Sequence, residues 1–384
     1  MQLLAGARHF DVTELPSYAP TGSGEHLYAF IEKENLDTDQ VVEALCAATG
    51  RAPRDVGYAG RKDRVAIARQ WFSVRLADED ALRRLTAPGG GRVSVLEISR
   101  DRGKLRLGAL RGNRFRLGLD PGGDPGALDE LRAGLGRLTQ FGVQNRFGAQ
   151  RFGNRGANVA IARAWALGDA ARAASLCIDP TGTWKPSEDL PSGFRPGPAG
   201  RVLGALRRDV SDAAGALRSA GPRFAKLIAS AGQSAVFNAV LDARRDAGLL
   251  YTLRPGDVVC RREGGVFRCL RGEEALHSAR AAPGALEVFA TGPLPGSEMY
   301  APGAAVAAEE RAWSAATGID WSFFDPRGPL ASPGDRRALI VAFLEPPSLE
   351  ADGEIVWLGF ALPAGSYATE VLTQLGVELP ERRS

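Results

Sequence analysis

Residues 60–70 read GRKDRVAIARQ and open with glycine. They place one carboxylate, Asp63, directly among the cationic side chains of Arg61, Lys62 and Arg64. Glycine and small side chains favour a tight turn, and residues 70–76, QWFSVRL, have the aromatic and branched side chains typical of a strand. Nearby cations favour the ionised form of a carboxyl group, so Asp63 is expected to act as a nucleophile or base. A solvated loop of charges would have the same composition, and both interpretations stay open at this point.

A second cluster of polar and aromatic side chains occupies residues 145–153, NRFGAQRFG. Aromatic, arginine and amide groups interleaved with glycine can stack a flipped base, hydrogen-bond its edge and hold the adjoining phosphates. The candidates for these contacts are Asn145, Phe147, Gln150 and Arg151. A hydrophobic turn with two surface arginines is the alternative interpretation.

Two further stretches have a distinct pattern. Residues 104–115, KLRLGALRGNRF, alternate basic and apolar side chains, which predicts a strand up to residue 110, and Gly112 with Asn113 predicts a turn. Residues 362–369, LPAGSYAT, read as a loop leading into a short helix with Ser366 as a possible N-cap.

The order of elements along the chain predicts an α+β fold. A helix is expected at residues 38–50, with Thr38 at its N-cap position, and long Ala-rich helices are expected near 157–174 and 223–247. Runs rich in β-branched and aromatic residues predict strands in the first and last parts of the chain, at residues 25–32, 70–76, 93–98, 115–119, 338–343 and 354–362.

The composition indicates a globular protein of about two domains, since the chain has 384 residues, 44% of them hydrophobic, and a formal charge of only +3. These values exclude disorder as the dominant state. The longest clean apolar run, residues 338–344, is far shorter than the roughly 20 residues that a membrane span needs. The first residues, MQLLAGARHF, lack the pattern of a signal peptide, so a cytoplasmic location is expected.

Residue types narrow the chemistry. Five of the 48 basic residues are lysine and 48 − 5 = 43 are arginine, which suits phosphate and base recognition but also follows from codon preference. Four cysteines without CxxC spacing and three histidines predict neither a zinc site nor a disulfide scaffold. The sequence also has no phosphate-binding loop, HExxH or GxSxG signature. A carboxylate is therefore the expected reactive group.

Together the four stretches resemble the motifs of the TruD family of tRNA pseudouridine synthases, and the resemblance covers nearly the whole chain. Residues 60–70 match the family pattern G-x-K-D-x-x-A-x-x-x-Q, and residues 145–153 match N-x-F-G-x-Q-R-F-G. Residues 104–115 match K-L-R-x-G-x-L-x-G-N-x-F, and residues 362–369 match LPAGS followed by an aromatic residue, Ala and Thr. The four motifs occur in the family order.

The resemblance implies a tRNA pseudouridine synthase, an isomerase that converts a uridine, in this family uridine 13 of the D arm, to pseudouridine. Asp63 matches the catalytic aspartate, and Lys62 or a nearby arginine is expected to keep it ionised. The expected substrate-binding residues are Phe10, Lys62, Asn145, Phe147, Gln150, Arg151 and Tyr367. The expected partner is tRNA, with no cofactor, metal or membrane; protein partners are unknown.

The family fold is a pseudouridine synthase core of mixed α/β type, interrupted by an inserted domain. The resemblance therefore assigns residues 1–153 and 342–384 to a split catalytic domain and residues 154–341 to an inserted α/β domain. The two halves of the core must then meet in space to bring Asp63 and Tyr367 together.

Departures from the family pattern leave other functions open. Leu4 or Ala5 stands where the family usually has a lysine, and Thr373 and Gln374 replace an arginine of the C-terminal helix. These changes motivate an alternative, a catalytically inactive RNA-binding or RNA-folding protein of the same fold. Against it stand three intact motif positions, Asp63, Asn145 and Phe147. A carboxylate glycosidase acting on another nucleoside is a weaker alternative, because the second well-placed acid is missing.

Overall fold

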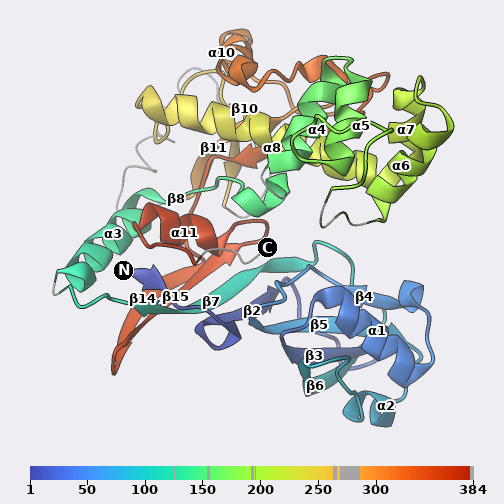
Figure 1. Ribbon diagram of the computed structural model, residues 1–384. Helices are drawn as coiled ribbons and strands as arrows, with labels where there is room; N and C mark the ends of the chain where they lie inside the picture. The colour runs from blue at the N-terminus through green and yellow to red at the C-terminus, as the bar shows by residue number, and fades with distance from the viewer. Residues whose placement is uncertain are drawn as a thin grey trace. The chain divides into compact units, whose positions relative to one another are not determined.

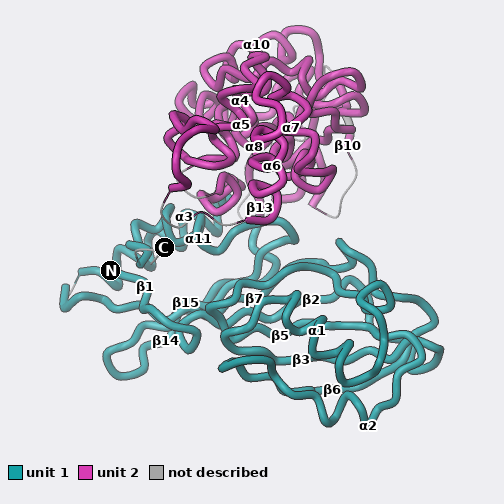
Figure 2. Tube along the Cα trace, turned by 45° about the vertical axis from the view of Figure 1, so that its right-hand side comes forward, with its two compact units in different colours: residues 1–143, 342–384 teal, residues 144–341 magenta. Residues whose placement is uncertain are grey.

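The computed structural model describes residues 1–124, 126–153, 156–191, 194, 196–262, 266–268 and 286–380. The chain divides into two compact units, which Figure 2 draws in teal and magenta. Unit 1 is Met1–Val143 with Ala342–Ser384, and unit 2 is Gln144–Val341. Helices and strands occur in both units, and the predicted α+β class is confirmed.

Unit 1 is built on a nine-stranded sheet in the order β14-β15-β7-β2-β5-β3-β6, with β1 added to β7 and β4 added to β5. Only the pair β2–β5 is parallel among these described strands. The strands are β1 (Gln2–Leu3), β2 (Phe10–Pro16), β3 (His26–Glu34), β4 (Val56–Tyr58), β5 (Ile67–Arg75), β6 (Arg92–Asp101), β7 (Leu110–Asp120), β14 (Glu345–Asp352) and β15 (Ile355–Pro363).

The two ends of the chain share this sheet. Strand β15 pairs with β7 from Val356 opposite Leu119 to Pro363 opposite Gly112. In Figure 1 the red C-terminal strands β14 and β15 accordingly lie beside the teal strand β7. Unit 1 therefore needs both the beginning and the end of the chain.

Helix α1 (Thr38–Thr49) covers one part of the sheet. Asp37, not Thr38, is its N-cap, because the Asp37 side chain accepts a hydrogen bond from the N–H of Gln40. The helix ends at Gly50, whose φ of 67° suits glycine. Its buried side chains pack in a core of aliphatic and aromatic residues that includes Leu27, Ile31, Val41, Leu45, Phe72 and Val74. The other helices of unit 1 are α2 (Glu79–Arg83), α3 (Ala127–Phe141) and α11 (Ala368–Gln374).

Two local predictions about unit 1 are wrong. Residues 104–109 form a loop rather than a strand, because Leu105 is buried while its N–H donates to the Ser73 hydroxyl. Strand β7 then runs through Gly112 without a turn. A Cβ at Gly112 would lie 2.1 Å from the carbonyl oxygen of Leu362, so this glycine permits the close approach of β15.

Unit 2 is mainly helical. Its helices are α4 (Ala157–Ala166), α5 (Ala170–Ile178), α6 (Pro198–Arg208), α7 (Ala213–Ser219), α8 (Pro222–Asp246) and α10 (Ala304–Ser314). A four-stranded sheet has the order β10-β9-β11-β12, formed by β9 (Val258–Arg261), β10 (Val266–Arg268), β11 (Val288–Leu294) and β12 (Asp335–Ala338). The short strands β8 (Val143–Gln144) and β13 (Ile340–Val341) form a separate two-stranded sheet.

Helix α8 is the central helix of unit 2. By length and composition it could cross a membrane, but 61% of its most apolar window is buried inside the protein, as in core helices of soluble proteins. The helix expected at residues 157–174 is present as α4 and α5, which are separated at Gly168 with φ of 79°. Residues 144–153 belong to unit 2, whereas the sequence analysis assigns them to the core, and Asn154 lies outside the described residues.

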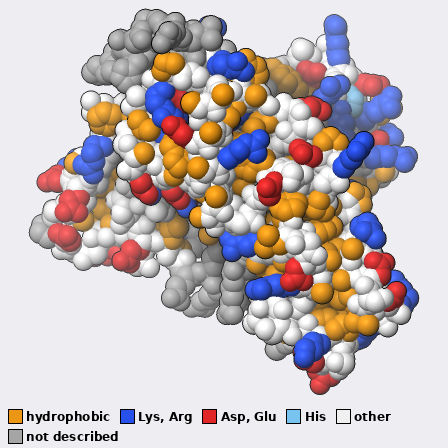
Figure 3. Space-filling view, turned by 90° about the horizontal axis from the view of Figure 1, so that it is seen from above, with side chains coloured by type: hydrophobic (Ala, Val, Ile, Leu, Met, Phe, Trp, Pro, Cys, Tyr) orange, Lys and Arg blue, Asp and Glu red, His pale blue; other side chains and the backbone are white. Residues whose placement is uncertain are grey.

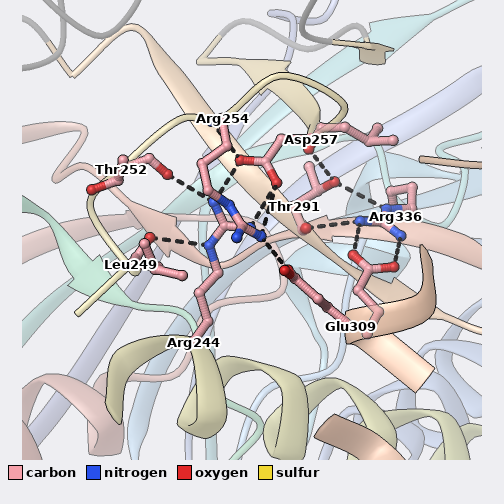
Figure 4. Close-up of polar contacts among 10 residues, drawn as sticks. Arg244, Leu249, Thr252, Arg254, Asp257, Thr291, Glu309 and Arg336 are labelled. Atoms are coloured by element: carbon pink, nitrogen blue, oxygen red, sulfur yellow. Dashed lines mark hydrogen bonds and ion pairs between the residues drawn. The ribbon is translucent and has the colours of Figure 1, made fainter. Parts of the chain in front are cut away.

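Buried ion pairs connect the helices and strands of unit 2 (Figure 4). Arg244 of α8 donates to both carboxylate oxygens of Asp257, at 2.8 and 2.6 Å. Arg336 of β12 pairs with Glu310 of α10 in the same two-pronged way, and both of these side chains are 1% exposed. The Arg336 guanidinium also donates to the hydroxyl and carbonyl oxygens of Thr291.

Glu310→Gln tests this network, because it leaves the Arg336 guanidinium buried without its counter-charge. We expect the free energy of unfolding of unit 2 to fall by about 3–5 kcal/mol. Glu309→Gln is the matched control, since Glu309 is 42% exposed in its pair with Arg254 and its loss should cost roughly 0–1 kcal/mol. Urea unfolding followed by tryptophan fluorescence measures both, and equal midpoints would contradict the expectation.

Candidate active site

The segment that carries Asp63 is fastened to unit 1 through its backbone. The carbonyl oxygen of Gly60 accepts a hydrogen bond from Gln70 Nε2 at 3.0 Å. The N–H of Lys62 donates to the Thr38 hydroxyl at 3.0 Å, and that hydroxyl donates to Gln70 Oε1 at 3.2 Å. Strand β5 and helix α1 thus hold the segment on both sides of Arg61, while the Asp63 side chain is exposed.

Lys62 is buried and its charge is neutralised within unit 1. Its Nζ lies 2.8 Å from Glu14 Oε2, and the two side chains are 4% and 1% exposed. The other carboxylate oxygen of Glu14 accepts a hydrogen bond from the N–H of Trp71 at 3.2 Å. From the sequence, Lys62 is expected to bind substrate and to keep Asp63 ionised, whereas in the structure its ammonium group pairs with Glu14.

Strand register brings the distant motifs of unit 1 together. Glu14 lies opposite Asn113, and Asn113 lies opposite Leu362. Neighbouring strands are about 4.8 Å apart, so these three residues form one row about 10 Å long across the sheet. Because Glu14 binds Lys62, the Asp63 segment lies at the same row.

Phe10 and Tyr367 also belong to unit 1. Phe10 is half-buried and makes an edge-to-face contact with Phe115, and Phe115 in turn contacts Phe360. Phe10 and Glu14 lie on the same face of β2, because side chains alternate between the two faces of a strand and these residues are four positions apart. Tyr367, also half-buried, is the N-cap residue of α11, so the helix begins one residue later than the expected cap at Ser366.

The Asn145 and Phe147 segment belongs to unit 2. The Arg337 guanidinium donates to both the backbone carbonyl and the side-chain oxygen of Asn145, and Asn145 Nδ2 donates to the Ala338 carbonyl at 3.0 Å. Arg337 also lies over the ring of Phe147, 4.2 Å from its centroid. The Asn238 side chain of α8 makes two 3.0 Å hydrogen bonds, one to the N–H and one to the carbonyl of Phe147.

The rest of this segment is fastened to the same helix. Arg151 donates to the hydroxyls of Ser230 and Ser234, and Arg146 pairs with Asp242. Gln150 lies in a short 3₁₀ helix, Ala149–Phe152, and its side chain is exposed. The residues predicted for one site therefore fall into two groups, one in each unit, and each group is held rigidly by its own unit.

Some of the residues that hold these groups have no motif signal. Arg337 and Asn238 lie far from residue 145 in the sequence and were not expected. For Glu14 a sequence signal exists. It is two residues after Val12, so in a strand the two side chains share one face, and a carboxylate on a buried face needs a partner.

The described residues contain no cluster of three or more His, Cys, Asp or Glu side chains that could hold a metal ion. Cys46 and Cys177 are free thiols, and Cys269 lies outside the described residues. One cavity of about 260 Å³ lies between β7, β14 and β15, and another of about 650 Å³ lies at the end of α6. Neither cavity is lined by a predicted site residue.

The arrangement is that of a known class of protein. The fold matches a solved structure described as a putative tRNA pseudouridine synthase D (TruD) from Methanosarcina mazei, with a TM-score of 0.74, 23% identity, and coverage of 98% of this chain and 95% of that one. The likeness shows that the chain has the fold of that structure, with its large mixed sheet and both α and β elements.

Sequence relatives identify the family. The protein is 38% identical to a tRNA pseudouridine synthase D of Geobacter metallireducens over 96% of this chain and 93% of the relative. It is also 38% identical to that of Geobacter sulfurreducens, over 95% and 91%. The model of the family "tRNA pseudouridine synthase D (TruD)" matches residues 1–189 and 188–375. The chain belongs to the tRNA pseudouridine synthase D family.

Asn238→Leu tests how the Phe147 segment is held. Loss of its two hydrogen bonds leaves a buried N–H and a buried carbonyl unpaired, so we expect a loss of about 2 kcal/mol in stability and at least about tenfold faster amide exchange in residues 145–152. Gln233→Leu is the matched control, because this amide of α8 bonds to Pro295 and Ser332 instead. Hydrogen exchange by mass spectrometry would contradict the expectation if both variants loosened the segment equally.

Proposed function

We propose that this protein isomerises a uridine of tRNA to pseudouridine and that Asp63 is its catalytic carboxylate. The observation that carries the proposal is the contrast between backbone and side chain at this position. The residues before Asp63 are fixed by Gln70, Thr38 and Glu14, while the Asp63 side chain is exposed to solvent. A carboxylate held in place yet exposed can meet a ribose brought to it by base flipping.

The reaction requires no added reactant. The bond from ribose C1′ to uracil N1 breaks, the base turns, and a bond from C1′ to C5 forms. The proton on C5 leaves and N1 ends protonated, so product and substrate are isomers. Asp63 serves either as the nucleophile that traps C1′ or as the base that removes the 2′ proton, and both roles use the ionised carboxylate.

The second group of residues would bind the flipped nucleotide. The exposed amide of Gln150 suits hydrogen bonding to the edge of a base. Asn145 and Phe147 are each 6% exposed and are bound within unit 2, so we assign them to shaping the base pocket. Arg151 would contact a flanking phosphate. We assign Lys62 to positioning rather than direct contact, because its ammonium group is buried against Glu14.

We further propose that unit 1 is the catalytic domain, with Phe10 and Tyr367 lining its site, and that unit 2 is the inserted domain. Residues 144–153 then belong to the insertion, because Asn238 and Arg337 bind them within unit 2. The sequence has Asp63, Asn145 and Phe147 at the matching motif positions, which argues against the inactive RNA-binding alternative. A cytoplasmic location, where tRNA substrates occur, stays a prediction.

Affinity for tRNA would come from arginine contacts to phosphate, not from Asp63. Over most of the surface visible in Figure 3, Lys and Arg side chains are interspersed with acidic ones. The small net charge of +3 agrees with this mixed surface. Substrate selection would then rest on the shape of the folded tRNA, which proteins read mainly through backbone and 2′-hydroxyl contacts.

Asp63→Asn should form no detectable pseudouridine while binding tRNA with a dissociation constant within about threefold of wild type, because the change removes the reactive charge and keeps the shape. Asp39→Asn is the control, since this exposed carboxylate pairs with Arg61 beside the same segment. Release of tritium from 5-³H-uridine tRNA measures turnover. Near-wild-type turnover by Asp63→Asn would remove Asp63 from the mechanism.

The proposed target is uridine 13 in the D arm. Deletion of the gene should abolish pseudouridine at that position in the tRNAs that carry it and leave other pseudouridines unchanged. Carbodiimide modification followed by sequencing maps every site at once. Restoration by the wild-type gene and not by Asp63→Asn is the control, and loss at a different position would reject the target while keeping the activity.

A further inference from the structure

Lys33 is a fully buried lysine whose ammonium group lies under the Asp63 segment. It belongs to β3, is 0% exposed, and its Nζ donates hydrogen bonds to the carbonyl oxygens of Leu36 and Asp63, the latter at 2.8 Å. Among the described residues no carboxylate oxygen lies within 4.0 Å of this nitrogen. The bond to Asp63 thus joins two residues 30 positions apart.

Burying an ammonium group is unfavourable unless fixed dipoles or charges replace its water shell. Burial lowers the pKa of Lys33 to about 8, while the carboxylates of Asp63 and Asp37 act in the opposite direction and favour its charged form. Lys62, the other nearby charge, acts with burial to lower the pKa. Asp63 is therefore near enough to Lys33 for the two charges to interact.

The cations adjacent to Asp63 in the sequence are bound elsewhere. Lys62 pairs with Glu14, and Arg61 lies 3.1 Å from Asp39. The Arg64 guanidinium donates to the carbonyl of Asn35. The side chain that reaches the backbone of Asp63 is Lys33, which no spacing in the sequence indicates.

We propose that Lys33 is the positioning residue of the active site. Its bond to the Asp63 carbonyl fixes the peptide from which the catalytic carboxylate projects, and its ammonium group supplies a fixed positive charge beside that carboxylate. The proposal rests on the proposed function of Asp63 and adds the residue that holds it. Lys33 itself is buried and touches no substrate atom.

The proposal predicts a pH dependence with a definite sign. Lys33 is protonated below a pKa of about 8, where the bond and the charge are both present, and loses its proton as the pH rises through that value. The rate of pseudouridine formation should therefore decline above about pH 8. Asp63, Asp37 and Lys62 are the charged groups that face Lys33, and Glu14 balances Lys62.

The test compares Lys33→Met with Lys104→Met in the full-length protein. Lys104 is the matched control, because its Nζ donates to a backbone carbonyl of unit 1, that of Arg54, but the side chain is exposed. We expect Lys33→Met to lower the single-turnover rate about 100-fold, as small misplacement of a catalytic group does, with the dissociation constant for tRNA within about threefold. Lys104→Met should retain the wild-type rate.

Two further measurements separate positioning from folding and from the proposed function. The decline of the wild-type rate above about pH 8 should be absent in Lys33→Met, and a rate that stays flat to pH 9.5 in the wild type would overturn the proposal even if the variant failed to fold. Amide exchange in residues 60–66 should be faster in Lys33→Met and unchanged in Lys104→Met. This readout needs no activity, so it remains decisive if wild-type protein forms no pseudouridine and the proposed function fails.

An unchanged rate with unchanged exchange in a folded Lys33→Met protein would show that Lys33 does not position Asp63. The same conclusion would follow if the alkaline decline persisted in the variant, because another group would then cause it.

Discussion

The antiparallel pairing of β15 with β7 is the constraint on which unit 1 depends. It places the last strand of the chain between β7 and β14 in the same sheet as strands β2 and β5 from the first 75 residues. The register is set by close contact, since only glycine at position 112 lets the carbonyl of Leu362 approach. This register puts Leu362, Asn113 and Glu14 in one row across the sheet. Because Glu14 pairs with Lys62, the motif that begins at Leu362 and the Asp63 segment lie at the same row.

Buried charged and polar side chains then determine where that segment lies. Four elements contribute to it: Glu14 from β2, Lys33 from β3, Thr38 from α1 and Gln70 from β5. A buried ammonium or carboxylate group is stable in its charged form only when its bonding partners are in place, because removal of a partner leaves an uncompensated ion. A segment held by such bonds has few alternative conformations, which is how a loop can present a reactive side chain to solvent and still be rigid.

The sequence predicted what is local and missed what depends on distant pairing. Helices α1 and α8 and the α+β class were predictable from periodicity, because buried faces repeat at helical spacing. The alternation in residues 104–110 predicted a strand with one apolar face. Leu105 is buried as expected, but Leu107 is 74% exposed, because residues 104–109 form a loop whose side chains do not alternate between two faces of a sheet. The partners of Lys62 and Asn145 could not be predicted, because Glu14 and Arg337 become neighbours only through the fold. The roles of the site residues stay predictions.

The lysines at positions 33 and 62 differ in their surroundings from the buried arginines, which the count of basic residues alone does not show. Arginine makes up 43 of the 48 basic residues, and codon preference alone would explain that excess. Two of the five lysines are nevertheless buried beside Asp63, while the fully buried cations of unit 2, Arg244 and Arg336, are arginines with two-pronged carboxylate partners. A guanidinium needs a planar partner and stays charged, whereas an ammonium group is compact, bonds to single carbonyls and can lose its proton when buried. At position 33 the lysine thus supplies a compact charge that binds two backbone carbonyls, those of Leu36 and Asp63.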